Sequence, residues 1–108
     1  MTPVLKALVA IFQQEVRAFD LVARFGGDEF AIMLVDVEND QALAIAERIR
    51  SAVAATPIRF GSRMLHVQLS GGISCFDIKD PDLTSILKRA DNALYHAKQQ
   101  GRNCVRIA

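Results

Sequence analysis

The chain opens with apolar residues at helical spacing and then changes to shorter, β-rich runs. Near the start, apolar residues recur every four positions: Val4, Leu8, Phe12 and Val16. This spacing is typical of one buried helix face. Thr2 and Pro3 come just before it, as a hydroxyl cap and a first-turn proline. The pattern predicts a helix that runs to about Phe19.

Two apolar runs with a glycine-rich break between them follow this helix. Residues 21–25 and 30–35 have the composition of strands, and between them lie Gly26, Gly27, Asp28 and Glu29. Two glycines followed by two carboxylates, placed between apolar runs, are typical of a hairpin loop. A β-hairpin is therefore predicted over residues 21–35.

A second helix and further strands are predicted in the middle of the chain. Asn39 or Asp40 can cap a helix whose inward positions are apolar: Ala42, Ile45, Ala46, Ile49 and Val53. Residues 58–60 and 64–76 are β-rich runs joined by a turn, and Gly71 and Gly72 interrupt the longer run. Such an interruption indicates a bulge or the close approach of another backbone.

The last helix has its own start and stop signals. Asp80, Pro81 and Asp82 precede its apolar face, Gly101 follows it as a C-terminal cap, and residues 103–107 form a closing strand. The order α-β-β-α-β-β-α-β predicts an α+β fold. We expect a two-layer sandwich, with helices packed on a largely antiparallel sheet.

Composition narrows the class of protein. The 108 residues are 51% hydrophobic, so a single folded domain is expected over residues 1–108. A net charge of +1 argues against binding of a nucleic acid polymer. The apolar segment near the start is broken by Lys6 and is too short to span a membrane. Cys75 and Cys104 lack the spacing of a metal site. We expect a cytoplasmic protein with two unpaired thiols and no membrane insertion of this segment.

Asp28 and Glu29 raise the first question of chemistry. A polar hairpin loop is most often a solvated turn, and for these residues alone that explanation suffices. Carboxylate oxygens, however, are the ligands that Mg²⁺ prefers, and Mg²⁺ is usually shared with substrate phosphates. The two glycines allow positive φ and a close approach of phosphate to the backbone. The turn therefore has the chemistry of a magnesium–nucleotide site if cations lie nearby.

Two cations near the other end of the chain can supply this need. Lys98 and Arg102 are four residues apart, which would place them on one side of a helix end. In most helices, cations at the C-terminal end are explained by their favourable interaction with the helix dipole, without any ligand. Alternatively, the lysine as a point charge and the arginine as a fork would hold a triphosphate.

Together these segments resemble the GGDEF family, the diguanylate cyclases. RFGGDEF at 24–30 is followed by RADNALYHAKQQGRN at 89–103, and AERIR at 46–50 and LSGGIS at 69–74 match in order and spacing. The resemblance covers essentially the whole chain. It implies a nucleotidyl-cyclase fold, which is palm-like and ferredoxin-like.

The resemblance also implies an activity. The family joins two GTP molecules into cyclic di-GMP with Mg²⁺ across a homodimer, each 3′-hydroxyl attacking the α-phosphate of the other GTP. By resemblance, Asp28 is a metal ligand and a candidate base, and Glu29 is the second signature acid of the catalytic site. The glycines bring the turn close to the phosphates, and Lys98 and Arg102 hold the terminal phosphates.

A second site is implied by Arg17 and Asp20. Five residues separate Asp20 from Gly26, which is the placement of the family's inhibitory RxxD motif, and this motif binds the product. Arg48 falls where the family supplies another arginine to this site. Arginine can bind a guanine edge or a phosphate, and aspartate can accept from guanine N–H groups. The simpler alternative is a surface Arg–Asp pair that contributes little.

The sequence departs from the family at its beginning. The family's first strand ends in a metal-binding Asp, and neither this strand nor the Asn and Asp that recognise guanine has a counterpart here. We therefore expect the C-terminal portion of a GGDEF domain, with weakened magnesium binding and GTP selection. In the family that strand lies between the hairpin and residues 65–74, so unpaired edges are expected without it. A homodimer or strand-exchanged oligomer is predicted.

Three functions stay open. The first is a diguanylate cyclase domain that is weakly active or inactive at this length. The second is a non-catalytic module that binds cyclic di-GMP through Arg17, Asp20 and Arg48. The third is a fragment that only folds and associates. Retention of both Asp28 and Glu29 counts against the third, because such a fragment has little physical need of them.

Overall fold

The computed structural model describes residues 2–108. The elements follow in the order α1 (Pro3–Glu15), β1 (Leu21–Gly26), β2 (Glu29–Met33), α2 (Asn39–Ala55), β3 (Ile58–Phe60), β4 (Arg63–Leu65), β5 (Gly71–Ile73), α3 (Leu83–Gln99) and β6 (Val105–Ile107). The predicted order is confirmed with one change. The long β-rich run at 64–76 forms two short strands, β4 and β5, instead of one.

The strands form three separate pairs. β1 pairs with β2 and β3 with β4, both antiparallel, whereas β5 and β6 pair in parallel. The α+β class with largely antiparallel pairing is confirmed. Among residues 2–108 no ladder joins the β1–β2 hairpin to the β5–β6 pair, so one edge of β2 and one edge of β5 have no strand partner in this part of the chain.

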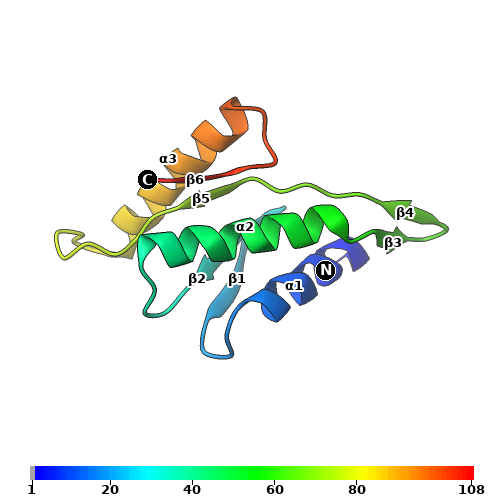
Figure 1. Cartoon of the computed structure of the whole chain (residues 1–108), viewed down its shortest axis with the longest axis horizontal. Helices are drawn as coiled ribbons and strands as arrows, with labels where there is room; N and C mark the ends of the chain where they lie inside the picture. The colour runs from blue at the N-terminus through cyan, green and yellow to red at the C-terminus, as the bar shows by residue number, and fades with distance from the viewer. Residues whose placement is uncertain (1) are drawn as a thin grey trace.

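Helices cover both faces of the β5–β6 pair (Figure 1). α1 and α2 pack on each other, and α2 also contacts β5 and β6. α3 contacts β5 and β6 but neither of the other helices, so it lies on the face opposite α2. Among the described residues, no helix combines the length and the apolar character needed to cross a membrane.

The main core lies between α1, α2 and the hairpin. Ile11, Phe12, Ile49 and Val53 are its buried members. The ring of Phe12 meets that of Phe30 edge-on, with centroids 5.3 Å apart, so β2 is anchored to α1. Burial of each large apolar side chain of this kind contributes about 1.5–3 kcal/mol, and this core fixes the hairpin relative to the two helices.

Gly72 allows α3 to rest directly on β5. A Cβ atom at this position would lie 2.0 Å from the carbonyl oxygen of Ala90 and 2.3 Å from the backbone nitrogen of Leu94. Both contacts are with helix backbone, which cannot move aside as a flexible side chain can. The close backbone approach predicted at this glycine is confirmed.

Two helix boundaries differ from those expected. α1 ends at Glu15 instead of about Phe19, because Val16 is extended (φ −112, ψ 166) and Asp20 accepts from the Arg17 N–H at 2.9 Å. α2 has Glu38 as its N-cap in place of Asn39 or Asp40, and the Glu38 N–H donates to Oε1 of Gln41 at 2.8 Å. In both cases a side chain three residues along the chain satisfies the backbone and fixes the boundary.

The other caps agree with the sequence signals. Thr2 Oγ1 accepts from the Leu5 N–H at 3.2 Å, and Asp82 accepts from the Ser85 N–H at 2.9 Å. Gly101 follows α3 with a φ of 110. α3 and the start of α1 are therefore placed as the capping residues predict.

Candidate functional site

The turn of the β1–β2 hairpin presents two acids to solvent. Gly26 and Gly27 have φ values of 152 and 44, and the strand register shifts between Arg24 and Gly26. Asp28 and Glu29 follow and are both exposed. A Cβ atom at either glycine would meet no heavy atom within 4 Å. The backbone of the turn is therefore open to a ligand, and the positive φ expected at the glycines is confirmed.

Arg24 braces this turn. Its Nε and Nη2 atoms donate to the carbonyl oxygen of Gly27 at 3.0 and 2.7 Å. Two donors from one planar guanidinium hold the oxygen more firmly than a single bond would. The sequence did not indicate this residue, because the contact depends on the conformation of the turn.

The cationic end of α3 differs from the geometry expected for it. α3 ends at Gln99, so Lys98 lies in its last turn and Arg102 lies beyond it. The expectation that both side chains share one side of a helix is therefore wrong. Gly101, Arg102 and Asn103 all have positive φ, at 110, 64 and 47. The Arg102 N–H donates back to the Ala97 carbonyl at 3.1 Å.

This left-handed turn is fixed by contacts that the sequence did not reveal. Nη1 of Arg50 donates to Oδ1 of Asn103 at 3.1 Å, and the Asn103 N–H donates to Oγ of Ser70 at 3.1 Å. Arg50 is in turn paired with Glu47 at 2.8 Å. Left-handed backbone at non-glycine residues is unfavourable unless its surroundings enforce it, and these contacts from Arg50 of α2 and from Ser70 do so.

Within this chain the strands of the β1–β2 hairpin do not contact α3. No Cα atom of β1 or β2 lies within 8 Å of one in α3. None of the ion pairs among residues 2–108 involves either acid of the turn or either cation of the α3 end. All four side chains are exposed.

Arg17 and Asp20, in contrast, form a clamp that closes the loop between α1 and β1. One carboxylate oxygen of Asp20 lies 3.4 Å from Nε of Arg17 and accepts the Arg17 N–H, and the other accepts the Val35 N–H at 2.9 Å. The Arg17 guanidinium also donates to the Val35 carbonyl. The Asp20 side chain is 1% exposed and that of Arg17 45%, so only the arginine is available to a ligand.

The clamp lowers the pKa of Asp20. The largest cause is the hydrogen bond from the Val35 N–H, which favours the charged form. The backbone and guanidinium of Arg17 act in the same direction, and desolvation of the carboxylate opposes them. The fold thus favours the charged form of Asp20 more strongly than water does.

A hollow of about 250 Å³ adjoins the clamp. Arg17 and Asp20 line it together with Gln13, Val16, Ala18 and Val22. Arg48 does not line it. Its Nε pairs with Glu15 at 2.7 Å, and Nη2 donates to the Glu15 carbonyl at 2.8 Å. The structure therefore brings together two of the three residues expected at the product site and holds the third at the end of α1.

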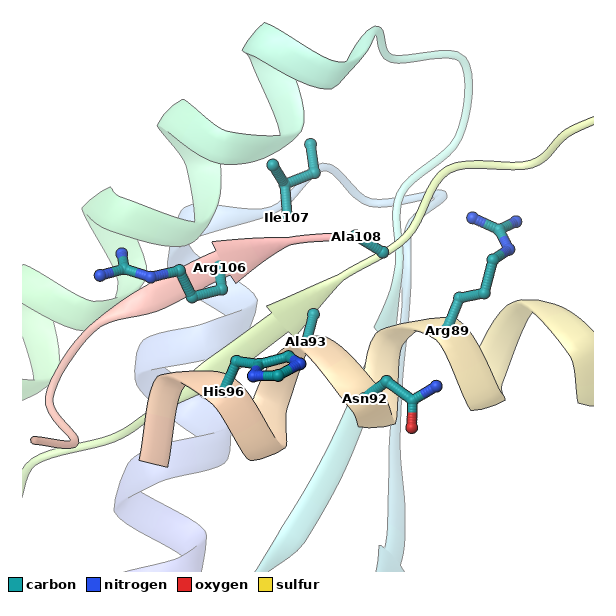
Figure 2. A pocket seen from close by; sticks show the side chains of 7 residues that line it. All are labelled: Arg89, Asn92, Ala93, His96, Arg106, Ile107 and Ala108. Atoms are coloured by element: carbon teal, nitrogen blue, oxygen red, sulfur yellow. The ribbon is translucent and has the colours of Figure 1, made fainter. Parts of the chain in front are cut away.

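A larger hollow of about 360 Å³ lies between α3 and β6 (Figure 2). Arg89, Asn92, Ala93 and His96 line it from α3, and residues 106–108 from the other side. Figure 2 shows Arg89 and Arg106 extending to opposite sides of it. Arg89 is engaged by Asp80 at 2.6 Å. No residue predicted for a site lines this hollow.

The donor set at the turn fits one kind of metal site. No group of three or more His, Cys, Asp or Glu side chains gathers anywhere in residues 2–108, so these residues alone do not build an all-protein cage. Asp28 and Glu29 offer carboxylate oxygens on an exposed turn. Mg²⁺ is commonly held by one or two carboxylates, with water and substrate phosphates completing its shell, and these two acids suit that arrangement.

Comparison with known proteins identifies relatives over nearly the whole chain. The model of the family described as diguanylate cyclase, GGDEF domain, matches residues 3–104. Diguanylate cyclase A of Treponema denticola is 38% identical over 105 residues, which make up 97% of this chain and 28% of that protein.

Solved structures agree with this match. A structure of PA1120 (TpbB or YfiN) from Pseudomonas aeruginosa, comprising only the GGDEF domain, has a TM-score of 0.91 and 34% identity over 98% of this chain and 62% of that one. The GGDEF domain of DgcB from Caulobacter crescentus, solved in complex with c-di-GMP, has a TM-score of 0.88 and 25% identity over 96% of this chain and 62% of that one. The chain spans less than two thirds of each of these relatives. Because the family match and the shared fold both extend over almost all of its residues, the chain belongs to the GGDEF family of diguanylate cyclase domains.

Proposed function

We propose that this chain supplies part of the GTP site of a diguanylate cyclase domain, which condenses two GTP molecules into cyclic di-GMP. The observation that carries the proposal is the signature turn, in which Gly26 and Gly27 adopt positive φ and expose Asp28 and Glu29 on an open backbone. An isolated surface turn has no structural need of two uncommitted acids, whereas a magnesium–nucleotide site uses them. Residues 1–108 then form a portion of one GGDEF domain.

In this reaction each residue has a distinct task. The 3′-oxygen of one GTP bonds to the α-phosphorus of the other while the bond from that phosphorus to the bridging oxygen breaks and pyrophosphate leaves; two such steps close the ring. Mg²⁺ would neutralise charge on the phosphates. Asp28 would hold that ion and accept the proton of the attacking hydroxyl, and Glu29 would support it. Lys98 and Arg102 would hold the terminal phosphates.

Association follows from the strand edges and from the lack of contact between the hairpin and α3. No Cα atom of β1 or β2 lies within 8 Å of one in α3, and one edge of β2 and one edge of β5 lack a strand partner within residues 2–108. A homodimer or strand-exchanged oligomer would bring two half-sites together and cover these edges. On this proposal the monomeric chain is weakly active or inactive. The two cysteines, which are free, suit a reducing compartment and hence the cytoplasm.

A non-catalytic module is the second candidate. It is favoured by the hollow beside Arg17, whose guanidinium is nearly half exposed and can reach a phosphate or a guanine edge. The DgcB domain was solved in complex with c-di-GMP. In this case the chain would bind cyclic di-GMP through Arg17, Asp20 and Arg48 without turning over GTP.

Calorimetric titration separates the two candidates. GTP with Mg²⁺ and cyclic di-GMP are added in turn to the wild-type chain. Magnesium-dependent GTP binding supports the cyclase site, and binding of cyclic di-GMP alone supports the module. Arg17→Ala should abolish binding of cyclic di-GMP while leaving GTP binding unchanged. The absence of binding to both ligands would contradict both candidates and leave only a fold that associates.

A further inference from the structure

The β3–β4 hairpin stands at one end of the molecule's 50 Å long axis (Figure 1). Its turn is formed by Gly61 and Ser62. In the ladder Arg59 lies opposite Met64, and Phe60 lies opposite Arg63. Opposite residues of an antiparallel pair share a face, so each face of the ribbon carries one arginine and one large apolar side chain. Phe60 is 50% exposed and Met64 53% exposed.

The hairpin is also the centre of a long stretch without acids. Residues 48–76 contain no Asp or Glu. Neither Arg59 nor Arg63 takes part in any side-chain hydrogen bond or ion pair within residues 2–108. Most other arginine side chains there donate to a carboxylate, an amide oxygen or a carbonyl, as do Arg17, Arg24, Arg48, Arg50, Arg89 and Arg106. The guanidinium groups of the two hairpin arginines are exposed and thus available to an external partner.

We propose that the β3–β4 hairpin is a docking edge for an anionic lipid surface. A ribbon that enters the headgroup region end-on places Phe60 and Met64 at the boundary with the acyl chains on both of its faces. Arg59 and Arg63 then lie beside them at the level of the lipid phosphates, because arginine buries its stem while its charged head stays in the polar layer. This inference does not rest on the proposed cyclase activity.

The two-sided distribution favours a lipid surface over a protein or a nucleic acid. A protein partner that covers one face of the ribbon would leave an apolar side chain and an arginine exposed on the other. A duplex offers phosphates but little apolar surface for a methionine. A bilayer interface surrounds the end of the hairpin and matches both the charges and the apolar groups.

A single fluorescent reporter tests the proposal directly, because the chain contains no tryptophan. Phe60→Trp places an indole on the hairpin. Phe76→Trp is the matched control, since Phe76 is 74% exposed and belongs to the loop between β5 and α3. This loop extends to the end of the molecule opposite the β3–β4 hairpin (Figure 1). Vesicles of phosphatidylcholine alone are compared with an equimolar mixture of phosphatidylcholine and phosphatidylglycerol. The emission of the hairpin variant should shift to the blue only with the mixed vesicles, and the emission of the control variant should not shift.

Cosedimentation with the same vesicles measures the contributions of charge and apolar surface. Arg59→Gln with Arg63→Gln should weaken binding by about fivefold per charge, or about 25-fold together. Lys79→Gln with Lys88→Gln changes the net charge equally, at exposed positions outside the hairpin, and should alter binding by less than about twofold. Phe60→Ala with Met64→Ala should weaken binding by at least about tenfold. Unchanged thermal unfolding verifies that each variant is folded.

Three results would overturn the proposal. The first is wild-type binding to mixed vesicles no stronger than to phosphatidylcholine alone. The second is an equal loss in the two charge variants, which would make the attraction a property of net charge. The third is retention by a DNA duplex that depends on Arg59 and Arg63 without any vesicle binding, which would assign the hairpin to nucleic acid.

Discussion

The signature turn and the Arg17–Asp20 clamp lie at opposite ends of β1, and both contain carboxylates that the sequence marks as functional. At the clamp, Asp20 accepts two backbone N–H groups and lies beside a guanidinium, and its side chain is almost fully covered. At the turn, Asp28 and Glu29 are exposed and take part in no ion pair of residues 2–108. One carboxylate supports the fold, and the other two are available to a ligand.

The comparison shows that a residue such as Asp20 can match a functional motif and yet serve, by its contacts, to stabilise the fold. For Asp20 to accept from a guanine N–H, its side chain would first have to become accessible, because it is 1% exposed and already accepts the Val35 and Arg17 N–H groups. Asp28 has no such bond to lose. We therefore expect ligand binding to depend directly on Asp28, and to depend on Asp20 mainly through the position of Arg17.

The largest expected effect is on ligand binding at the turn. Asp28→Ala removes a carboxylate ligand of Mg²⁺, so the affinity for GTP in the presence of Mg²⁺ should fall by at least about tenfold. Without Mg²⁺ the variant and the wild type should be alike. Calorimetry measures the affinity, and the free energy of unfolding should change by no more than about 0.5 kcal/mol. Equal affinity of both proteins for GTP–Mg²⁺ would remove Asp28 from the site.

The second effect is on stability at the clamp. Asp20→Ala deprives the N–H groups of Val35 and Arg17 of their acceptor and frees the Arg17 guanidinium. We expect Tm to fall by several degrees in calorimetric unfolding, whereas Asp28→Ala serves as the control that leaves it unchanged. If both variants unfold at the same temperature, Asp20 contributes no more to stability than Asp28, and the proposed difference between the clamp and the turn is wrong.

A smaller effect should distinguish the two glycines of the turn. Gly27, at φ 44, lies near the left-handed region that other residues can enter, so Gly27→Ala should cost about 1 kcal/mol. Gly26, at φ 152, lies where side chains are rarely found, so Gly26→Ala should cost more, about 1–3 kcal/mol. Neither change creates a clash, because both positions face open space. Urea unfolding of the two variants gives the order, and a reversed order would mean that the turn adopts another conformation in solution.

The smallest effect is on the pH dependence of stability. The folded-state pKa of Asp20 is lowered from 3.8, so its contribution is present above that value and is lost as pH falls through the folded-state pKa. The difference in Tm between the wild type and Asp20→Asn should therefore be constant near neutral pH and narrow below about pH 4. The pKa of Asp80 is lowered too, chiefly by the Asp77 N–H, but Asp80 titrates in both proteins and cancels. A difference that grows on acidification would be the opposite of this expectation.

Local signals in the sequence predicted most of the elements. Thr2, Asp82 and Gly101 mark helix ends correctly because each acts on backbone groups within a few residues. The hairpin at 21–35 was predicted from its glycine pair. The close approach at Gly72 was one of the two alternatives predicted there, because a residue without a Cβ allows another backbone to come near. The boundaries at Glu15 and Glu38 were missed because the local acceptors there, Asp20 and Gln41, lie beyond the expected caps.

Contacts between distant segments could not be predicted in the same way. Arg48 matched a position of the family's product site, yet it pairs with Glu15. No role was predicted for Arg50, yet it donates a hydrogen bond to Asn103 and so holds the turn after α3. Arg102 has the right spacing from Lys98 for a helix, but the helix ends first. Each of these outcomes depends on which side chain of another element comes within reach, and a single sequence does not contain that distance.

The sequence by itself determined the family, through motifs in a recognisable order and spacing. It also determined the conformation of the signature turn, because the two glycines set the backbone dihedral angles locally. Only the tertiary structure decided which charged groups remain free. The packing of α1, α2 and β2 commits Asp20 and Arg48 to internal partners and leaves Asp28, Lys98 and the β3–β4 arginines to solvent. The reason is that the interaction energy of a charged group depends on the atoms around it. In the folded chain those atoms belong to segments that are far apart in the sequence.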